Sequence, residues 1–299
     1  MLTKRSIQLV FSILLFGSCQ QIIEVEDIEF KEQLVLNCVM GTNERDFGSA
    51  YSRVELTSNR DILDSAQDYK GITEAEVLLY ENNSLLGIGR ESLNGRYYFW
   101  TNPKAGNNYI ISVKAEGYDP IEAEQTIPRS LNNAEIKQIT PEPIPNLNEE
   151  HRYRLTYTID DPPGLNFYDL DLKVRYSYGA SGQTDYNVDF WEVGVNLDAF
   201  NENDTSRVFS DELFDGQLHT RTIEFDYVNE DNFQSDHIDI ILNLRHVSEA
   251  YYLYYTSLER QAESHRNPFA EPALAYTNVV NGFGAFLTYS SNPASYRVK

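Results

Sequence analysis

The chain has 299 residues, with 24 Lys and Arg against 46 Asp and Glu, so its formal net charge is −22. A hydrophobic content of 41% is typical of a folded protein and is too high for a disordered chain. The negative charge argues against nucleic acids and anionic membrane surfaces as partners, because both are bound by basic side chains.

The N-terminal segment 1–18 predicts a bacterial signal peptide. Lys4 and Arg5 precede the apolar run 7–16, which is too short to span a bilayer, since a spanning helix needs about 20 residues. The run leads into Gly17-Ser18-Cys19, which resembles a lipobox, where small residues precede a cysteine that receives the lipid. We therefore expect Cys19 to carry acyl chains such as palmitate and to anchor the mature protein. An ordinary cleaved signal with an incidental cysteine is the alternative.

Cys38, the second cysteine, is expected in the hydrophobic core. Residues 19–32 read as a lipidated tether, and Cys38 follows them in an apolar segment. A catalytic thiol needs an activating base close by, and the neighbouring sequence supplies none. With Cys19 lipidated, no intrachain disulfide can form, so the fold depends on its hydrophobic core.

Residues 33–138 predict an immunoglobulin- or transthyretin-like antiparallel β-sandwich. Turn signals at Asn82-Asn83, Asn94-Gly95 and 106–108 separate short segments of β-forming residues, and the chain holds 21 Tyr and 15 Phe. The expected strands are 35–39, 52–57, 75–80, 96–100, 109–115 and 121–126.

The segment 139–150 predicts a linker between two domains. Pro141, Pro143 and Pro145 donate no hydrogen bond to a strand neighbour and favour an extended spacer. We place the domain boundary here.

Residues 151–299 predict a second β-rich domain, a sandwich or a barrel-like fold, with one helix at 248–263. Ser248 is a favourable N-cap, and Tyr251, Tyr254 and Leu258 recur at helical spacing. The tyrosines are expected mainly in the core, and rings left exposed would suit sugars or partner proteins. The expected strands are 151–159, 168–178, 219–227, 237–247, 284–289 and 296–298.

Asp169 and Asp171 are a carboxylate pair whose spacing could serve catalysis. They lie two apart on a strand, about 6.6 Å along the chain, which is a spacing seen in inverting glycoside hydrolases. The preferred interpretation is the solvent face of an amphipathic strand, because acidic pairs arise by chance in so acidic a chain. We expect no catalytic residue.

Oxygen-rich loops raise the question of Ca²⁺. Asp198 to Asp204 cluster potential ligands without the order of an EF-hand, so a polar loop is preferred and a structural Ca²⁺ is the alternative. The stretch Ser210-Asp211-Glu212 could form a similar loop or cap a turn ending at Gly216. His237 and Asp239 give only a weak metal signal. No metal site or cofactor is predicted.

Two further segments predict structural roles. Gly282-Phe283-Gly284 reads as a tight bend that feeds the last long strand. In the loop 267–272 the prolines fix the backbone, and Phe269 is expected to fill the core rather than face a ligand.

Gly87-Ile88-Gly89 does not predict a nucleotide site, because it lacks the third glycine and the following helix of such a site.

Motifs along the chain resemble one known family. They are 34–37, 75–80, 95–97, 109–113, 117–118, 127–128, 209–216, 248–252, 267–272 and 276–286. Together they resemble the Bacteroidota lipoproteins grouped as domain of unknown function 4249, which are often encoded beside TonB-dependent receptors.

The resemblance implies a lipid-anchored outer-membrane protein that assists such a receptor, and it carries no catalytic residues. Acidic residues begin only at Glu24, so we leave periplasmic and surface-facing orientations open. We expect a non-enzymatic binding or accessory protein with a glycan or peptide as candidate ligand. A glycan- or peptide-acting hydrolase and an adhesive or structural envelope protein are the alternatives.

Overall fold

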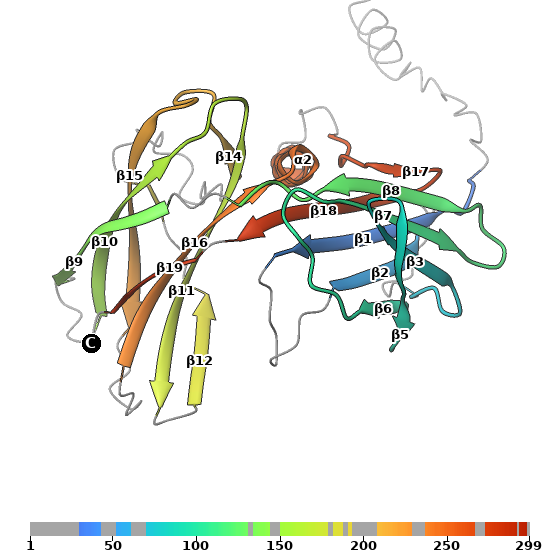
Figure 1. Cartoon of the computed structure of the whole chain (residues 1–299), viewed down its shortest axis with the longest axis horizontal. Coiled ribbons are helices and arrows are strands. Elements are labelled where there is room, and N and C mark those ends of the chain that lie inside the picture. The colour runs from blue at the N-terminus through green and yellow to red at the C-terminus, as the bar shows by residue number, and fades with distance from the viewer. Residues whose placement is uncertain are drawn as a thin grey trace, which may run out of the picture. The chain divides into compact units, whose positions relative to one another are not determined.

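A computed structural model gives the fold of most of the chain (Figure 1). It describes residues 30–42, 52–60, 70–130, 134–143, 150–178, 182–187, 191–192, 208–228, 237–266, 273–291 and 293–297. Residues 32–299 form one compact unit of β-sheets with a single helix in the described part. The mainly β fold is therefore confirmed, while Cys19 and the expected signal peptide lie outside the described residues.

One long sheet runs through both halves of this unit. Its strands are β1 (Leu34–Gly41), β2 (Ser52–Ser58), β5 (Arg90–Glu91), β6 (Arg96–Phe99), β11 (Phe167–Tyr178), β12 (Gly182–Asn187), β14 (Val208–Ser210), β16 (His237–Val247), β18 (Phe283–Ser291) and β19 (Ala294–Arg297). The order is β12-β11-β16-β18-β1-β2-β6-β5, with β14 on β11 and β19 on β16. Strands β1 and β18 pair in parallel, so the end of the chain joins its beginning.

A five-stranded sheet packs against one end of the long sheet. Its strands, in order, are β17 (Val279–Val280), β8 (Ile121–Thr126), β7 (Asn108–Lys114), β3 (Glu76–Glu81) and β4 (Ser84–Ile88). The core between the sheets includes Leu36, Tyr97, Tyr109 and Phe286, and Cys38 lies in it as expected. The N-terminal sandwich therefore exists, but β17 and β18 complete it, and the parallel pair departs from the antiparallel expectation.

A four-stranded sheet packs at the other end. Its strands, in order, are β13 (Trp191–Glu192), β15 (Leu218–Val228), β10 (Glu150–Asp160) and β9 (Ala134–Pro143). Tyr157, Leu172 and Phe225 lie in the core that it shares with β11 and β16. Strand β9 includes residues 139–143, the first part of the expected linker. Prolines are tolerated there because β9 is an edge strand and leaves one row of backbone groups unpaired.

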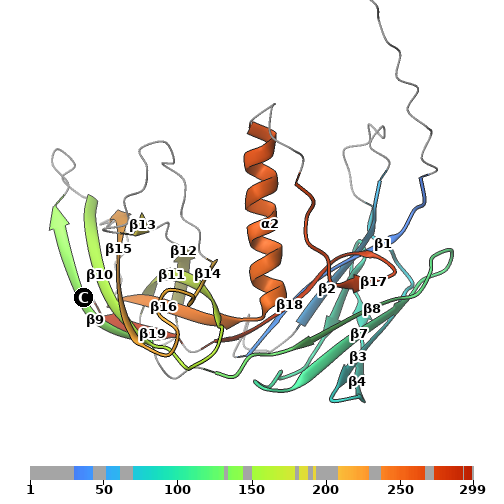
Figure 2. The same cartoon turned by 90° about the horizontal axis from the view of Figure 1, so that it is seen from above.

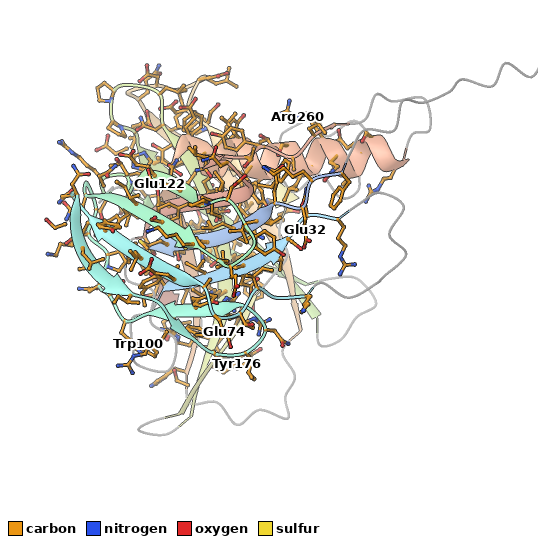
Figure 3. The ribbon with its side chains drawn as sticks, turned by 90° about the vertical axis from the view of Figure 1, so that its right-hand side faces the viewer. Glu32, Glu74, Trp100, Glu122, Tyr176 and Arg260 are labelled. Atoms are coloured by element: carbon orange, nitrogen blue, oxygen red, sulfur yellow. The ribbon has the colours of Figure 1, made fainter. Side chains whose placement is uncertain are left out.

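The helix α2 (Glu249–Arg266) packs on the long sheet between its two ends. Ser248 caps it, since its side-chain oxygen accepts a hydrogen bond from the Tyr251 amide at 3.3 Å. Its first turns pack Tyr251 against β18, whereas Arg260 and Arg266 are exposed where the helix stands away from the sheet (Figures 2 and 3). No helix in the described ranges has both the length and the apolar character needed to cross a bilayer.

Successive side chains in two strands of the long sheet pack in different hydrophobic clusters. Leu170 faces the C-terminal sandwich core, while Phe167 belongs to the cluster under α2. In β18, Phe286 faces the N-terminal core and Leu287 faces the helix. Strands β11 and β18 are therefore buried on both faces, because a strand points successive side chains to opposite sides.

The outer strand β4 and the segment after β6 leave apolar side chains in solvent. Asn82 and Asn83, both at positive φ, form the expected turn that leads into β4, a strand that we had not predicted. The exposed fraction is 64% for Ile88 on β4 and 61% for Trp100, which follows β6 and is labelled in Figure 3. Arg90 lies over the Trp100 ring at 5.6 Å.

Candidate functional site

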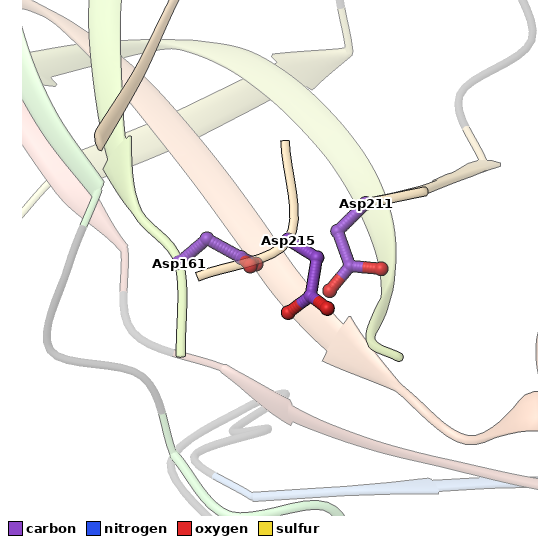
Figure 4. A group of neighbouring side chains, drawn as sticks. All are labelled: Asp161, Asp211 and Asp215. Carbon is purple, nitrogen blue, oxygen red and sulfur yellow. The ribbon is translucent and has the colours of Figure 1, made fainter. Parts of the chain in front are cut away.

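Three aspartates from two loops meet beside the C-terminal sandwich (Figure 4). Asp161 directly follows β10, Asp211 directly follows β14, and Asp215 lies in the turn before β15. Each offers a carboxylate oxygen, and these oxygens all lie within 4.8 Å of one another. We call this group the aspartate cluster.

Hydrogen bonds across the two loops hold the cluster together. The carboxylate Oδ2 of Asp211 accepts hydrogen bonds from the Asn166 amide at 2.9 Å and from its side-chain Nδ2 at 2.8 Å. The Asp215 carboxylate accepts one from the Gly164 amide at 2.8 Å. These contacts fix the loop 161–166 against the loop 211–217.

Asp161 is the second buried member of the cluster. Its carboxylate accepts hydrogen bonds from the Tyr168 hydroxyl and from the Gly216 amide, the latter at 2.8 Å. Burial raises the pKa of Asp161, and the negative charge of Asp211 adds to this rise, although both hydrogen bonds oppose it. Two carboxylates thus repel each other in a site that is largely shielded from water.

Asp211 has an oxygen without a partner. The residue is fully buried, and its Oδ1 accepts no hydrogen bond. No described Lys or Arg forms an ion pair with Asp161, Asp211 or Asp215. Buried carboxylate oxygens are normally hydrogen-bonded, paired with a cation side chain or bound to a metal. The chemistry of this oxygen-only group suits a hard divalent cation.

Asp169 and Asp171, the carboxylate pair considered above for hydrolysis, form a buried ion-pair network rather than a catalytic site. Arg245, from the neighbouring strand β16, places Nη1 at 2.9 Å from Asp169 and Nη2 at 3.0 Å from Asp171. The two aspartates are only 4% and 5% exposed, so the expected solvent face is wrong. The prediction fails because α2 packs over this face of β11. The alternation of residues within a strand does not show which other elements pack on it.

The helix completes this network. The Tyr251 hydroxyl donates a hydrogen bond to Asp169 at 3.0 Å, and the Arg245 guanidinium lies 4.8 Å from the Tyr289 ring centre. Burial lowers the pKa of Arg245, but Asp169 and Asp171 together raise it above the ordinary value. The carboxylate oxygens therefore hold a cation rather than face a cleft, which is a structural role.

The helix tyrosines are mostly enclosed. Tyr251 is buried, while Tyr252, Tyr254 and Tyr255 are half-buried and pack in the cluster under the helix. The core interpretation is therefore confirmed. None of these four rings is left exposed, because they stack on one another and on the sheet, as Tyr252 does on Phe167 at 4.8 Å.

An open pocket of about 530 Å³ lies where β7 and β8 approach the start of α2. Its walls are mainly polar and include Asn108, Glu124, His246 and Glu249. His246 binds the Arg129 carbonyl oxygen at 2.8 Å, and burial lowers the pKa of this imidazole. Polar walls of this kind suit a hydrated ligand such as a sugar better than an apolar one.

The structure describes some of the remaining residues that the sequence singled out, and others lie outside the described part. Asp239 is paired with Arg297 at 3.0 Å, so it is not free to join His237 in a metal site. The bend at Gly284 is confirmed, with φ of +92°. The Asp198–Asp204 loop and Phe269 lie outside the described residues.

Asp161 and Asp215 are the cluster residues that sequence reasoning missed. The sequence singles out Asp211 alone, as part of the polar stretch Ser210-Asp211-Glu212. The two loops are 45 or more residues apart in the sequence. The pattern that they share, an aspartate and a glycine in a turn between two strands, is too common to predict a joint site.

The fold and the cluster define a β-rich protein of two sandwiches that share one sheet. A family model with the description "Domain of unknown function (DUF4249)" matches residues 21–294. The chain belongs to this family. No curated protein matches it.

Proposed function

We propose that this protein is a lipid-anchored outer-membrane lipoprotein with a non-catalytic binding role, assisting a TonB-dependent receptor. The lipobox-like ending at Cys19 supports the anchor. The observation that carries the binding role is the exposed apolar edge at β4, where Ile88 and Leu85 lie in solvent on the outermost strand of a sheet.

An exposed edge strand offers unpaired backbone groups to an extended partner segment, and apolar side chains beside it add buried area on binding. The Asp169–Arg245–Asp171 network supports the non-catalytic side of the proposal, because it engages the one carboxylate pair that had suggested hydrolysis.

Lipid anchoring is tested by Cys19→Ala. The variant should move from the membrane fraction to the soluble fraction of the envelope, because the thiol that receives the lipid is removed. Cell fractionation with immunoblotting measures this, and Cys38→Ala is the matched control that should remain membrane-bound. Unchanged attachment of Cys19→Ala would remove the basis for the lipoprotein assignment.

Receptor binding is tested by Ile88→Lys. A charged residue on an edge strand opposes strand addition, so co-purification with a β-barrel receptor after mild detergent extraction should fall at least about tenfold, which corresponds to about 1.4 kcal/mol. Leu274→Lys, at another highly exposed leucine, is the control and should leave the complex intact. Equal yields from both variants would assign the partner surface elsewhere.

A further inference from the structure

We propose that Asp161, Asp211 and Asp215 bind a Ca²⁺ ion, which clamps the loop 161–166 to the loop 211–217. This inference rests on the aspartate cluster alone and is independent of the proposed receptor role. The observation that points to a ligand is the buried, unpartnered Oδ1 of Asp211.

The other oxygen of Asp211 fixes the orientation of the side chain. Oδ2 accepts two hydrogen bonds from Asn166, at 2.9 and 2.8 Å, so the carboxylate is held in one orientation. Oδ1 is buried and shielded from water, and a carboxylate oxygen of Asp211 lies within 4.8 Å of oxygens of Asp161 and Asp215 (Figure 4). A fixed, buried and unpaired anionic oxygen is costly unless a cation neutralises it.

The ligand atoms select the type of cation. All three residues offer carboxylate oxygens, which hard cations such as Ca²⁺ prefer, whereas Zn²⁺ favours nitrogen and sulfur. Three carboxylates have six oxygens, and up to five of them can bind the ion, because Asn166 occupies both lone pairs of Asp211 Oδ2. Ca²⁺ accepts six to eight oxygens in irregular geometry, so water ligands complete the set. Mg²⁺ demands a near-ideal octahedron. Asp215 is exposed, so it gives the ion an entry path and leaves room for water ligands.

The hydrogen bonds already present are compatible with an ion. Asp161 accepts from Tyr168 and Gly216, and Asp215 accepts from Gly164. A carboxylate oxygen can accept a hydrogen bond and still bind a metal, because it has two lone pairs. Backbone amides thus orient the carboxylates, as the outer shell of a metal site does.

The test is calcium alone, added to the full-length protein stripped with EDTA. At about 10 mM CaCl₂ we expect the Tm to rise by about 3–8 °C, given the affinity of extracellular Ca²⁺ modules and the size of this unit. Isothermal titration calorimetry should give one Ca²⁺ per chain. MgCl₂ at the same concentration should raise the Tm by less than half as much.

Asp211→Asn is the decisive variant. It should lose the calcium response and gain thermal stability without calcium, because the repulsion from Asp161 is removed. If Asp211→Asn does not fold, Asp215→Asn provides the test. It removes a charge at the exposed rim of the cluster, so it should weaken calcium binding at least about tenfold. Asp239→Asn is the matched control, since it removes a carboxylate that is paired with Arg297, and it should keep the full response.

Two results would overturn the proposal. One is a folded wild-type protein with neither a Tm shift nor binding heat in calcium. The other is a wild-type response in folded Asp211→Asn or Asp215→Asn, which would place the ion elsewhere in the chain. Neither result bears on the receptor role, which is read from co-purification.

Discussion

Replacing Arg245 by methionine should lower the free energy of unfolding by about 3–5 kcal/mol. Arg245 is the shared cation between Asp169 and Asp171, and both carboxylates are buried beneath α2. Methionine keeps much of the side-chain volume but leaves two buried anions without their cation. The loss should therefore be far larger than the value of a surface ion pair.

The measurement is urea denaturation of the soluble chain without its signal peptide, and Arg297→Met is the matched control. Arg297 pairs with Asp239 at a similar distance, 3.0 Å, but its own side chain is 58% exposed. Exposed pairs contribute about 0–1 kcal/mol, so the control should unfold close to the wild type. A loss below about 1 kcal/mol for Arg245→Met would mean that water reaches the aspartates and that α2 does not seal this face.

Gly284→Ala should lower the free energy of unfolding by about 2–4 kcal/mol. Gly284 has a φ of +92° and pairs in parallel with Leu36 on β1. A Cβ atom built there would lie 2.1 Å from the Leu36 carbonyl oxygen. The obstacle is backbone in the middle of the long sheet, so neither strand can move aside without disturbing its neighbours.

Gly117→Ala separates this clash from backbone strain alone. Gly117 has a similar φ of +84°, but a Cβ there would meet no atom within 4 Å. Its substitution should therefore cost only the left-handed conformation, about 1 kcal/mol. Thermal and urea unfolding of both variants measures the difference. Equal losses would show that β1 and β18 can separate locally without cost.

The local elements follow closely from the sequence. Each expected strand lies within about two residues of an observed strand, and the helix begins one residue after its predicted cap, Ser248. Alternation and turn residues are local signals, so they predict a strand without knowledge of its neighbours. The strands that were missed are short or lie on edges, as β4 and β5 do, and carry weak alternation.

The candidate site was predictable only in part. Asp211 stood out in a polar loop, but its partners Asp161 and Asp215 gained meaning only when two loops were placed side by side. Asp169 and Asp171 show the same limit in the opposite direction. Their alternation with leucines is real, yet the polar face is buried, because Arg245 and Tyr251 arrive from other elements.

The acidic composition, the lipobox-like ending at Cys19 and the alternating strands were set by the sequence alone, since each depends on residue types at short spacing. The tertiary structure decided the rest. Parallel pairing of β1 with β18 makes the two halves share one sheet. The proline-rich segment 139–143 pairs with β10 as part of an edge strand. Contacts between distant segments also decided which acidic residues are solvated and which are buried, because burial depends on the elements that pack over a strand.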